Sequence, residues 1–528
     1  MSRGYFSLLL HAHLPFVRHP EFDDFLEEDW LFEAVAETYV PLLQMLHKMR
    51  DDRLPLKLTF TLTPTLCAML NDPLLRNRTE RYFERADELA QREFEKPEVD
   101  AAWRDLSLFY KRRFSEGLKY YRKVLNRDIV GAFAELQSDG LIEIATCAAT
   151  HGFLPLMREI PQAVRAQIQI GCEEHQKNFG VAPRGIWLPE CAYYPGVEEE
   201  LRRANIHWFA LDAHGVMLGN PQPRFAIFTP YFTPAGPAGI GRDRDSSRQV
   251  WSSREGYPGD PAYRDFYRDL GKDLPVEELR GIYGESVENR FTGLKYHQIT
   301  GGGGEKALYN RAWAMAAADA HATDFMQSRV AQFEDLQKKM PVDFLVFTPF
   351  DAELFGHWWF EGPEFLNLFL RKAAYDQNTF AFTTPSDFLR QHPTQQILSP
   401  AASSWGNRGY WEVWLDECNH WIYPHLHQCA REMVRLSGQA IERERSEVEE
   451  RTLKQLVREL LLAQSSDWAF LMRTGTASEY AALRTQTHVD NFFRLAKDFT
   501  TKHIDETFLR QCEERHNLFS DIKWQHYV

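Results

Sequence analysis

Two carboxylates, each placed just after a short apolar segment, are the residues of this sequence best placed to do chemistry. Asp351 follows the apolar run 344–347, and Glu190 follows the run 185–188. A proline separates each run from its carboxylate, and we expect it to end the strand because proline cannot donate to a β-ladder. Acidic groups at the carboxyl ends of parallel strands lie where α/β enzymes build their active sites. Tryptophans such as Trp358 follow, and their flat faces suit sugar rings.

Such a pair of carboxylates is typical of enzymes that cleave glycosidic bonds. In a retaining enzyme of this kind the two carboxyl groups lie about 5–5.5 Å apart, and one attacks the anomeric carbon while the other protonates the leaving oxygen. The acid has to stay protonated near neutrality, which burial or a neighbouring negative charge achieves. Asp351 and Glu190 can meet over one barrel mouth. Spacing alone leaves Glu353 or Glu143 as alternative members of the pair.

Histidines follow two other predicted strands. His11 and His13 come at the end of the strand expected over 5–10, and β-alternation places both on one face. One of them can be a hydrogen-bonded core histidine, or one or both can bind a substrate hydroxyl. A metal site is a third and weaker hypothesis, since no Asp or His cluster is apparent nearby. His151, after the strand expected over 140–145, is a further functional candidate.

Two loops have compositions that invite a functional interpretation. The segment 229–241 is rich in proline and glycine and carries Tyr231 and Phe232, so it can be a lid that excludes water or a plain connection. The glycine run 301–304 does not continue into the Gly-Lys-Ser/Thr of a phosphate-binding loop. We expect it to be a loop near the cleft rim.

The bulk composition excludes several classes of protein. With 61 Lys+Arg against 75 Asp+Glu, the net charge is −14, which disfavours binding to nucleic acid or anionic membrane. The 44% hydrophobic content favours a folded core over disorder. We find no uninterrupted apolar stretch approaching 18 residues and no signal-peptide pattern at the start, so we predict no membrane span.

Cysteines and a histidine trio give no metal or disulfide signal. The 7 cysteines are odd in number and scattered, and none forms a CxxC pair, which argues against a disulfide framework or a thiolate zinc site. We therefore expect a reducing cytoplasm. His420, His425 and His427 do not have the i, i+4 spacing of an HExxH helix, so we reject them as metal ligands.

The chain changes character along its length. At 528 residues it exceeds one ordinary domain. We predict a catalytic region over 1–399, interrupted at about 73–136 by charged helices with solvated faces, and a helical region over 400–528. Asp467, beside a tryptophan at a helix end, either reaches the cleft or caps the next helix.

In this order, the motifs resemble the signature regions of glycoside hydrolase family 57. The resemblance spans essentially the whole chain, and it is closest to the 1,4-α-glucan branching enzymes of that family. The matching segments are His11–Pro15, Gly140–His151, Trp187–Glu190, Phe347–Trp358 and Ser403–Trp414, with the helices around Asp467.

The resemblance implies a fold and a set of roles. The fold is an incomplete (β/α)7 barrel of the α/β class, with an inserted helical subdomain and an all-α C-terminal domain. Glu190 is then the nucleophile and Asp351 the general acid/base, without a catalytic metal or cofactor. The implied substrate contacts, to which our strand-end argument adds His13, are His11, His151, Trp405, Trp414 and Asp467, with Trp30 as a further stacking residue.

One departure from the family pattern affects the expected activity. Branching members are thought to use a loop tyrosine that shields the glucosyl-enzyme from water, and here only Tyr231 and Phe232 are candidates, since the tip 235–241 has no aromatic residue. We expect transfer of an α-1,4-glucan (amylose, amylopectin or glycogen) to a 6-hydroxyl. The rivals are hydrolysis at the same site, 4-α-glucanotransferase activity, a non-catalytic glucan-binding protein and a metal-dependent polysaccharide deacetylase. The sequence does not indicate an oligomeric state.

Overall fold

The computed structural model describes residues 3–528 apart from 253–254, 285–286, 288–289 and 301–304. The glycine run 301–304 therefore lies outside the described residues. Within them, no helix is both long enough and apolar enough to cross a membrane.

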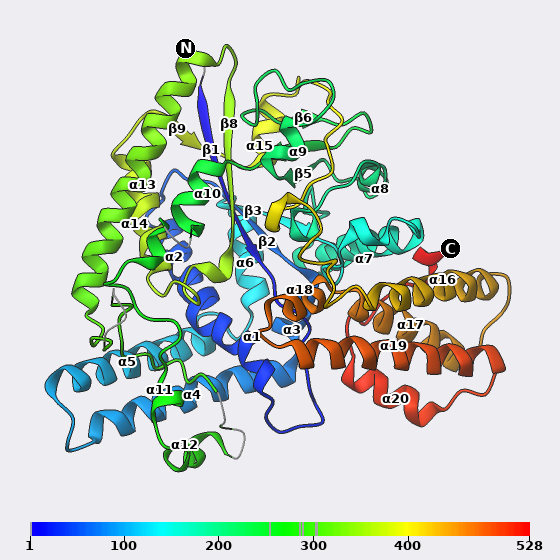
Figure 1. Ribbon diagram of the computed structural model, residues 1–528, viewed down its shortest axis with the longest axis horizontal. Helices are drawn as coiled ribbons and strands as arrows, with labels where there is room; N and C mark the ends of the chain where they lie inside the picture. Colours follow the sequence, from blue (N-terminus) through cyan, green and yellow to red (C-terminus); the bar gives the residue numbers. More distant parts are fainter. Residues whose placement is uncertain (1–2, 253–254, 285–286, 288–289, 301–304) are drawn as a thin grey trace.

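A curled sheet, parallel except for one short strand, forms the centre of the molecule (Figure 1). The strand order is β6-β7-β5-β4-β3-β2-β1-β8, and β9 pairs with β1. The sheet curls back on itself where Arg242, just after β7, bridges Phe347 of β8. The fold is thus the predicted incomplete (β/α)7 barrel. The strands are β1 (Gly4–Ala12), β2 (Leu58–Leu62), β3 (Ile142–Cys147), β4 (Gly185–Trp187), β5 (Trp208–Leu211), β6 (Tyr231–Phe232), β7 (Ala238–Gly241), β8 (Phe344–Asp351) and β9 (Phe380–Phe382).

Pro349 does not end its strand, contrary to our expectation. β8 continues through it to Asp351, with Pro349 opposite Leu9 of β1. β8 is the last strand of the sheet order. Among the described residues, the strand that pairs with β8 at Pro349 is β1. A missing N–H is tolerated at such an edge position. Asp351 is consequently the last residue of a strand and not part of a loop.

The first helical segment contains a π-helical turn. η2 (Val35–Tyr39) interrupts the helix between α1 (Asp29–Ala34) and α2 (Val40–Asp51). Such single turns are rare and are frequently found at functional sites. Here the turn presents two side chains, Glu37 and Tyr39, to the loop that follows β8.

Two excursions leave the barrel. The first is made by α4 (Pro73–Glu95) and α5 (Ala101–Lys123), which pack against each other and begin at the capping residues Asp72 and Asp100. α6 (Ile129–Ser138) instead packs on β3 and the helices around the barrel. The second excursion, over 244–310, is one that we did not predict. Its described helices are α10 (Arg244–Trp251), which still packs on β8, α11 (Leu270–Asp273) and α12 (Val276–Tyr283), which contacts α4.

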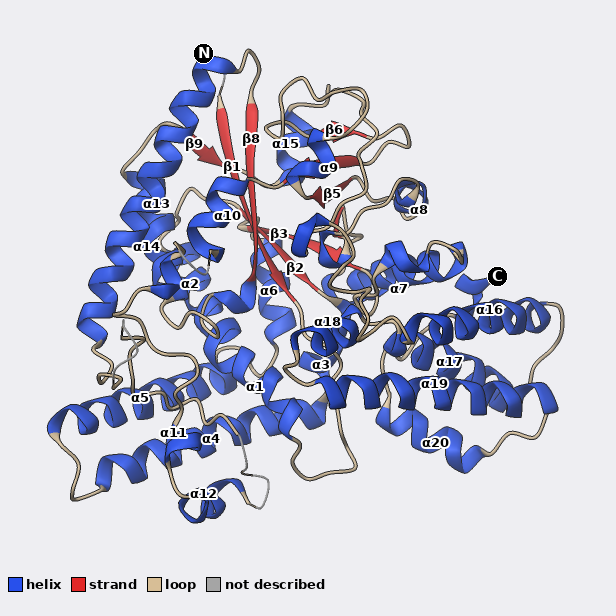
Figure 2. Ribbon diagram, in the orientation of Figure 1, coloured by secondary structure: helices blue, strands red, loops and turns tan. Residues whose placement is uncertain are grey.

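The remaining helices flank the sheet or follow it. Figure 2 shows that the C-terminal part is built from helices alone. The helices around the barrel are α3 (Pro64–Asn71), α7 (Pro161–Phe179), α8 (Val197–Arg203), α9 (Ala213–Met217), α13 (Arg311–Lys339), α14 (Gly362–Tyr375) and α15 (Pro385–Gln391). The C-terminal helices are α16 (Ile422–Ile441), α17 (Glu447–Ala463), α18 (Ser466–Thr474), α19 (Ser478–Thr501) and α20 (Glu506–Arg515).

A fully buried carboxylate links the C-terminal helices. Glu459 of α17 accepts hydrogen bonds from Nδ1 of His488 on α19 at 2.7 Å and from Nδ1 of His516 after α20 at 2.8 Å. Gln455 donates a third at 2.8 Å. Buried charges are retained when several donors satisfy them. Glu459 therefore joins three segments that are distant in sequence.

We predict that Glu459→Gln lowers the stability of the C-terminal helices. The amide offers one acceptor where the carboxylate offers two, so one buried histidine N–H loses its partner, at a cost of about 2–4 kcal/mol. Thermal unfolding followed by circular dichroism measures the effect. Glu447→Gln, an exposed change on the same helix, should leave the melting temperature nearly unchanged. Equal melting temperatures for the two variants would contradict the prediction.

Candidate active site

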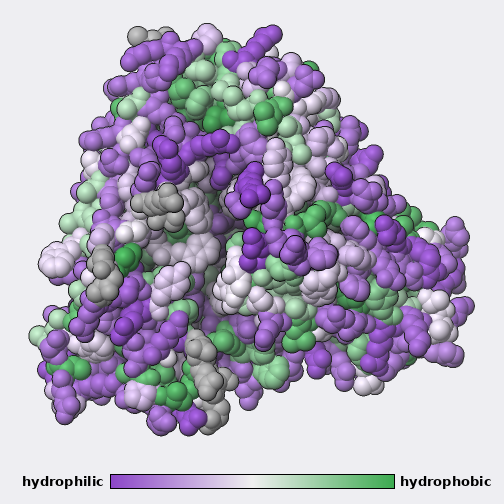
Figure 3. Space-filling view, in the orientation of Figure 1, coloured by the Kyte–Doolittle hydropathy of each residue, from purple (hydrophilic) through white to green (hydrophobic). Residues whose placement is uncertain are grey.

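The carboxyl ends of β1, β3, β4 and β8 bring the predicted histidines and carboxylates together. Nε2 of His11 lies 3.2 Å from Nε2 of His151, and Nδ1 of His151 lies 3.7 Å from Oε1 of Glu190. His11 is paired in register with Asp351 across β1 and β8. Parallel strands end at the same edge of a barrel, which is why residues so far apart in sequence meet. In the space-filling view of Figure 3, this face of the molecule has a hollow near its middle, and most residues around the hollow are hydrophilic.

Glu190 lies in a strained turn directly after β4. Its φ and ψ are 61° and 23°, in the left-handed region, and the following Cys191 also has a positive φ of 50°. Non-glycine residues rarely adopt this conformation, and where they do they cluster at active sites. The turn follows Pro189 at once, so the carboxylate leaves the strand at the barrel mouth.

Two residues from the last third of the chain hold the two oxygens of Glu190. Nε1 of Trp405 donates to Oε2 at 3.0 Å, and the Ser466 hydroxyl donates to Oε1 at 2.8 Å. The same hydroxyl lies 2.8 Å from Nδ1 of His151. Burial raises the pKa of Glu190, and these two hydrogen bonds, which favour the charged form, oppose the rise.

Asp351 has a different environment. Among the described residues none donates a hydrogen bond to its carboxyl group. Burial, aided by the negative charges of Glu353 and Glu190, raises the pKa of Asp351 well above its usual value, and Arg242 opposes this only in part. Two carboxyl groups whose environments separate their pKa values have the properties of an acid and a nucleophile. The environments favour Asp351 as the proton donor and Glu190 as the anion.

The two alternative carboxylates lie in different places. Glu143 lies near the amino end of β3, away from the carboxyl ends of the strands, and accepts from Nε1 of Trp208 at 2.9 Å and from the Ser386 hydroxyl. Its position removes it from the pair. Glu353 lies beside the site, one short turn after Asp351.

Asp467 reaches the site from the first turn of α18. Its carboxylate lies 2.9 Å from Nε2 of His13, whose Nδ1 lies 3.0 Å from the Thr63 hydroxyl. Burial raises the pKa of Asp467, but His13 outweighs it and brings the pKa to about 2. Burial lowers the pKa of His13, and Asp467 more than reverses this. Each of the two groups thus favours the charged form of the other.

His13, His151 and Asp467 also offer ligand atoms within 4.8 Å of one another, which raises the question of a metal. The rings of His13 and His151 stack at 3.8 Å with an interplanar angle of 15°. Ring-nitrogen lone pairs lie in the ring plane, so in stacked rings they run nearly parallel and do not converge on one ion. The geometry fits a hydrogen-bonded network better than a metal centre. Our sequence argument had missed this group because Asp467 is 454 residues from His13.

The predicted aromatic contacts differ in exposure. Trp405 packs on Trp187 at 4.7 Å and lines the site. Trp30 is half-buried, with its edge towards Tyr480. Trp414 is only 1% exposed, and its ring stacks on that of Phe153 with the centroids 4.6 Å apart. It is therefore a buried packing residue beside the site.

The lid candidates are placed elsewhere, and this prediction is wrong. Tyr231 is buried in β6, where its hydroxyl donates to the carbonyl of Ala226 at 2.7 Å. Phe232 pairs with Ala238 in the same hairpin. The hairpin tip precedes β7, so it lies at the amino ends of the barrel strands, opposite the carboxylates. The segment is a plain connection.

Sequence reasoning missed two polar residues of the site. Ser466 is the first residue of α18, and nothing in the sequence around it indicates a role in the site. Arg242 follows β7, and its Nε donates to Asp212 at 2.7 Å while its guanidinium lies 5.9 Å from the Trp405 ring. Its place after a strand was a usable signal, but β7 has the composition of a loop.

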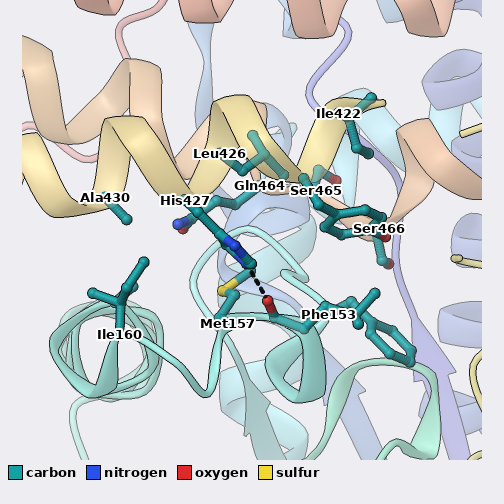
Figure 4. A pocket seen from close by; sticks show the side chains of 13 residues that line it. Phe153, Met157, Ile160, Ile422, Leu426, His427, Ala430, Gln464, Ser465 and Ser466 are labelled. Atoms are coloured by element: carbon teal, nitrogen blue, oxygen red, sulfur yellow. Dashed lines mark hydrogen bonds between the residues drawn. The ribbon is translucent and has the colours of Figure 1, made fainter. Parts of the chain in front are cut away.

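A small pocket beside the site is lined by His427, one of the three histidines that we rejected as metal ligands. Figure 4 shows Phe153, Met157 and Ile160 facing Leu426 and Ala430 of α16. His427 of α16 donates from Nε2 to the carbonyl of Leu156 at 2.6 Å. This bond ties the C-terminal helices to the segment after β3, a structural role for His427.

Comparison with known proteins gives two family matches. The model described as glycosyl hydrolase family 57 matches residues 7–250, and the one described as 1,4-alpha-glucan branching enzyme, C-terminal, matches residues 425–527. The 1,4-alpha-glucan branching enzyme TK1436 of Thermococcus kodakarensis is 32% identical, over 100% of this chain and 79% of that protein.

Solved structures agree over nearly the whole chain. The α-amylase AmyC of Thermotoga maritima has a TM-score of 0.92 and 40% identity, covering 99% of both chains. The GH57-type branching enzyme of Pyrococcus horikoshii has a TM-score of 0.89 and 33% identity, covering 99% of this chain and 97% of its own.

We predict that Ser466→Ala slows glycosidic cleavage about 10- to 100-fold, since a lost hydrogen bond to a charged group is worth about 1.5–3 kcal/mol. Without this donor the pKa of Glu190 rises, so the acidic limb of the pH–rate profile should move to higher pH. Steady-state kcat/KM across pH measures both. Thr474→Ala removes an exposed hydroxyl from the same helix and serves as the control. An unshifted acidic limb would argue against the assignment.

Proposed function

Because the chain belongs to glycosyl hydrolase family 57, we propose that it is a 1,4-α-glucan branching enzyme that works by a retaining double displacement. One observation carries the proposal. Ser466, which holds an oxygen of Glu190, lies within the segment that matches the branching-enzyme C-terminal description. The nucleophile candidate of the barrel is therefore completed by the part of the chain typical of branching enzymes.

In the first step Glu190 attacks the anomeric carbon of an α-1,4 bond while Asp351 gives its proton to the leaving 4-oxygen. The chain is then held as an ester on Glu190. Trp405 and Ser466 keep the carboxylate oriented before attack. The aromatic face of Trp405 offers the stacking surface for a sugar ring.

In the second step Asp351, now ionised, takes the proton of an acceptor 6-hydroxyl, whose oxygen attacks the anomeric carbon and breaks its bond to Glu190, which leaves as a carboxylate. An α-1,6 bond forms with net retention, and Asp351 regains its proton. The His13–Asp467 pair provides a fixed charged edge for substrate hydroxyls. The substrate that we propose is an α-glucan such as amylose, amylopectin or glycogen, and the mechanism uses no cofactor.

A second candidate is hydrolysis at the same site. The structural relative AmyC is described as an α-amylase, and Tyr231 and Phe232 are packed in the sheet, not over the carboxylates. Water then competes with the acceptor hydroxyl for the ester. The balance of the two reactions is a property of the same intermediate.

We also propose a cytoplasmic location. All 7 cysteines lie among the described residues and are free, and five of them are buried. Free thiols are typical of reducing compartments. The charge of −14 agrees with a protein that does not use nucleic acid as a partner.

Incubation with amylose, followed by proton NMR, tests the function. We expect new α-1,6 linkages to exceed new reducing ends, because each transfer creates a branch whereas each hydrolysis creates a reducing end. Glu190→Gln should abolish both signals and guards against contaminants. Reducing ends without branches would establish the hydrolase instead. No change in either, with glucan binding retained, would leave a binding protein.

A further inference from the structure

A second carboxyl group lies next to the acid/base candidate and has no role in the mechanism above. Glu353 belongs to the short turn η6 (Ala352–Leu354) that follows Asp351, and only 4% of it is exposed. The Tyr39 hydroxyl donates to its Oε1, and the backbone N–H of His13 donates to the same oxygen at 3.1 Å. Buried polar groups in proteins are normally hydrogen-bonded, and Glu353 has two donors. The role of this buried carboxyl group next to Asp351 remains to be explained.

The loop that carries Glu353 is clamped onto the π-helical turn η2. His357 lies 2.9 Å from Glu37 through Nδ1, and its backbone N–H donates to the Thr38 hydroxyl at 3.2 Å. Gly356 has φ 123°, and a Cβ there would lie 1.9 Å from the carbonyl oxygen of Glu37. The loop and η2 are therefore in contact at backbone distance. The segment that carries Glu353 is therefore fixed against η2.

The donors are divided unequally between the two carboxyl groups. Glu353 has Tyr39 and His13, whereas Asp351 has no donor among the described residues. Hydrogen bonds to an anion favour the ionised form. The negative charge of Glu353 acts on Asp351, and when two carboxyl groups interact, ionising one disfavours ionising the other. The geometry therefore assigns the first negative charge of the pair to Glu353 and leaves the proton on Asp351.

The surrounding charges agree with this order. The groups acting on Asp351 are Glu353, Glu190 and the opposing Arg242, and those acting on Glu353 are Tyr39 and His13, which itself pairs with Asp467. Burial raises the pKa of Glu353 to about 7, with the donors opposing the rise. The pKa of Asp351 is raised well above its usual value.

We propose that Glu353 is a positioning residue whose negative charge, held in place by Tyr39 and His13, keeps Asp351 in its acid form for glycosidic cleavage. The inference rests on the proposed function, because it assigns a task to the general acid of that reaction. Glu353 touches neither the substrate nor the reacting atoms in this role.

The test is the pH profile of Glu353→Gln. The amide keeps the size of the side chain but carries no charge, so Asp351 loses its proton at lower pH. We expect the alkaline limb of kcat/KM for amylose cleavage to move down by about one pH unit, which is about a tenfold lower rate on that limb. Glu353→Asp keeps a carboxyl group and should restore part of the wild-type limb.

Glu361→Gln is the matched control. Glu361 is equally buried in the same stretch of chain, but it accepts from the Tyr309 hydroxyl at 2.6 Å and from the backbone N–H of Arg264 at 3.2 Å, outside the site. Any loss of packing common to both changes appears in this variant as a uniform drop in rate. A limb that moves equally in both variants, or in neither, would overturn the proposal.

A readout without substrate separates this inference from the proposed function. Infrared difference spectra report the C=O band of protonated carboxyl groups, and Asp351→Asn identifies the band of Asp351. We expect that band to titrate at lower pH in Glu353→Gln, and Tyr39→Phe to keep the band of Glu353 to higher pH. If amylose is not cleaved but both bands shift as expected, the proposed function is wrong and the order in which the two carboxyl groups ionise is supported. If amylose is branched and the Asp351 band does not move, the inference fails alone.

Discussion

The active site depends on giving donors to a carboxylate buried at the mouth of a barrel. An unpaired buried anion is costly, and such groups persist in proteins only when hydrogen-bonded or paired. Glu190 obtains its two donors, Trp405 and Ser466, from the segment that follows the last strand and from α18. The barrel strands position the carboxylate, and the hydrogen bonds from the later segments favour its charged form. The rest of the arrangement, including the contact of His151 with Ser466, follows from this requirement.

The roles that we propose for Glu190 and Asp351 rest on the surroundings of the two carboxyl groups and not on residue type. Glu190 is bonded at both oxygens, whereas Asp351 faces two negative neighbours and receives no hydrogen bond among the described residues. Enzymes with two carboxyl groups commonly separate their roles in this way. The π-helical turn contributes to the same end, because it brings Tyr39 to Glu353 and Glu37 to His357. A π-helical turn early in the chain thus contacts a carboxyl group 314 residues later.

The strands and their carboxylates could be predicted from the sequence because their signals are local. The apolar runs 344–347 and 185–188 indicated β8 and β4, and Asp351 and Glu190 lie at or just after the ends of these strands. Ser466 could not be found this way, and neither could the pairing of Asp467 with His13, since each depends on a contact across more than 270 residues. The prediction for Tyr231 was wrong for a related reason. The loop-like composition of the segment 229–241 did not indicate that Tyr231 belongs to a hairpin whose tip lies at the opposite end of the barrel. Composition indicates turns, but only the sheet register tells which end they occupy.

The arrival of α18 also has a consequence in time. Domains tend to fold as units, with the earlier segments first as the chain leaves the ribosome. All the barrel strands, β1 to β9, end by Phe382, but the serine that donates to Glu190 is residue 466. A folded barrel on a growing chain would therefore hold a nucleophile still short of one of its donors. The donor from α18 therefore reaches Glu190 only after the C-terminal helices have been synthesised and have docked.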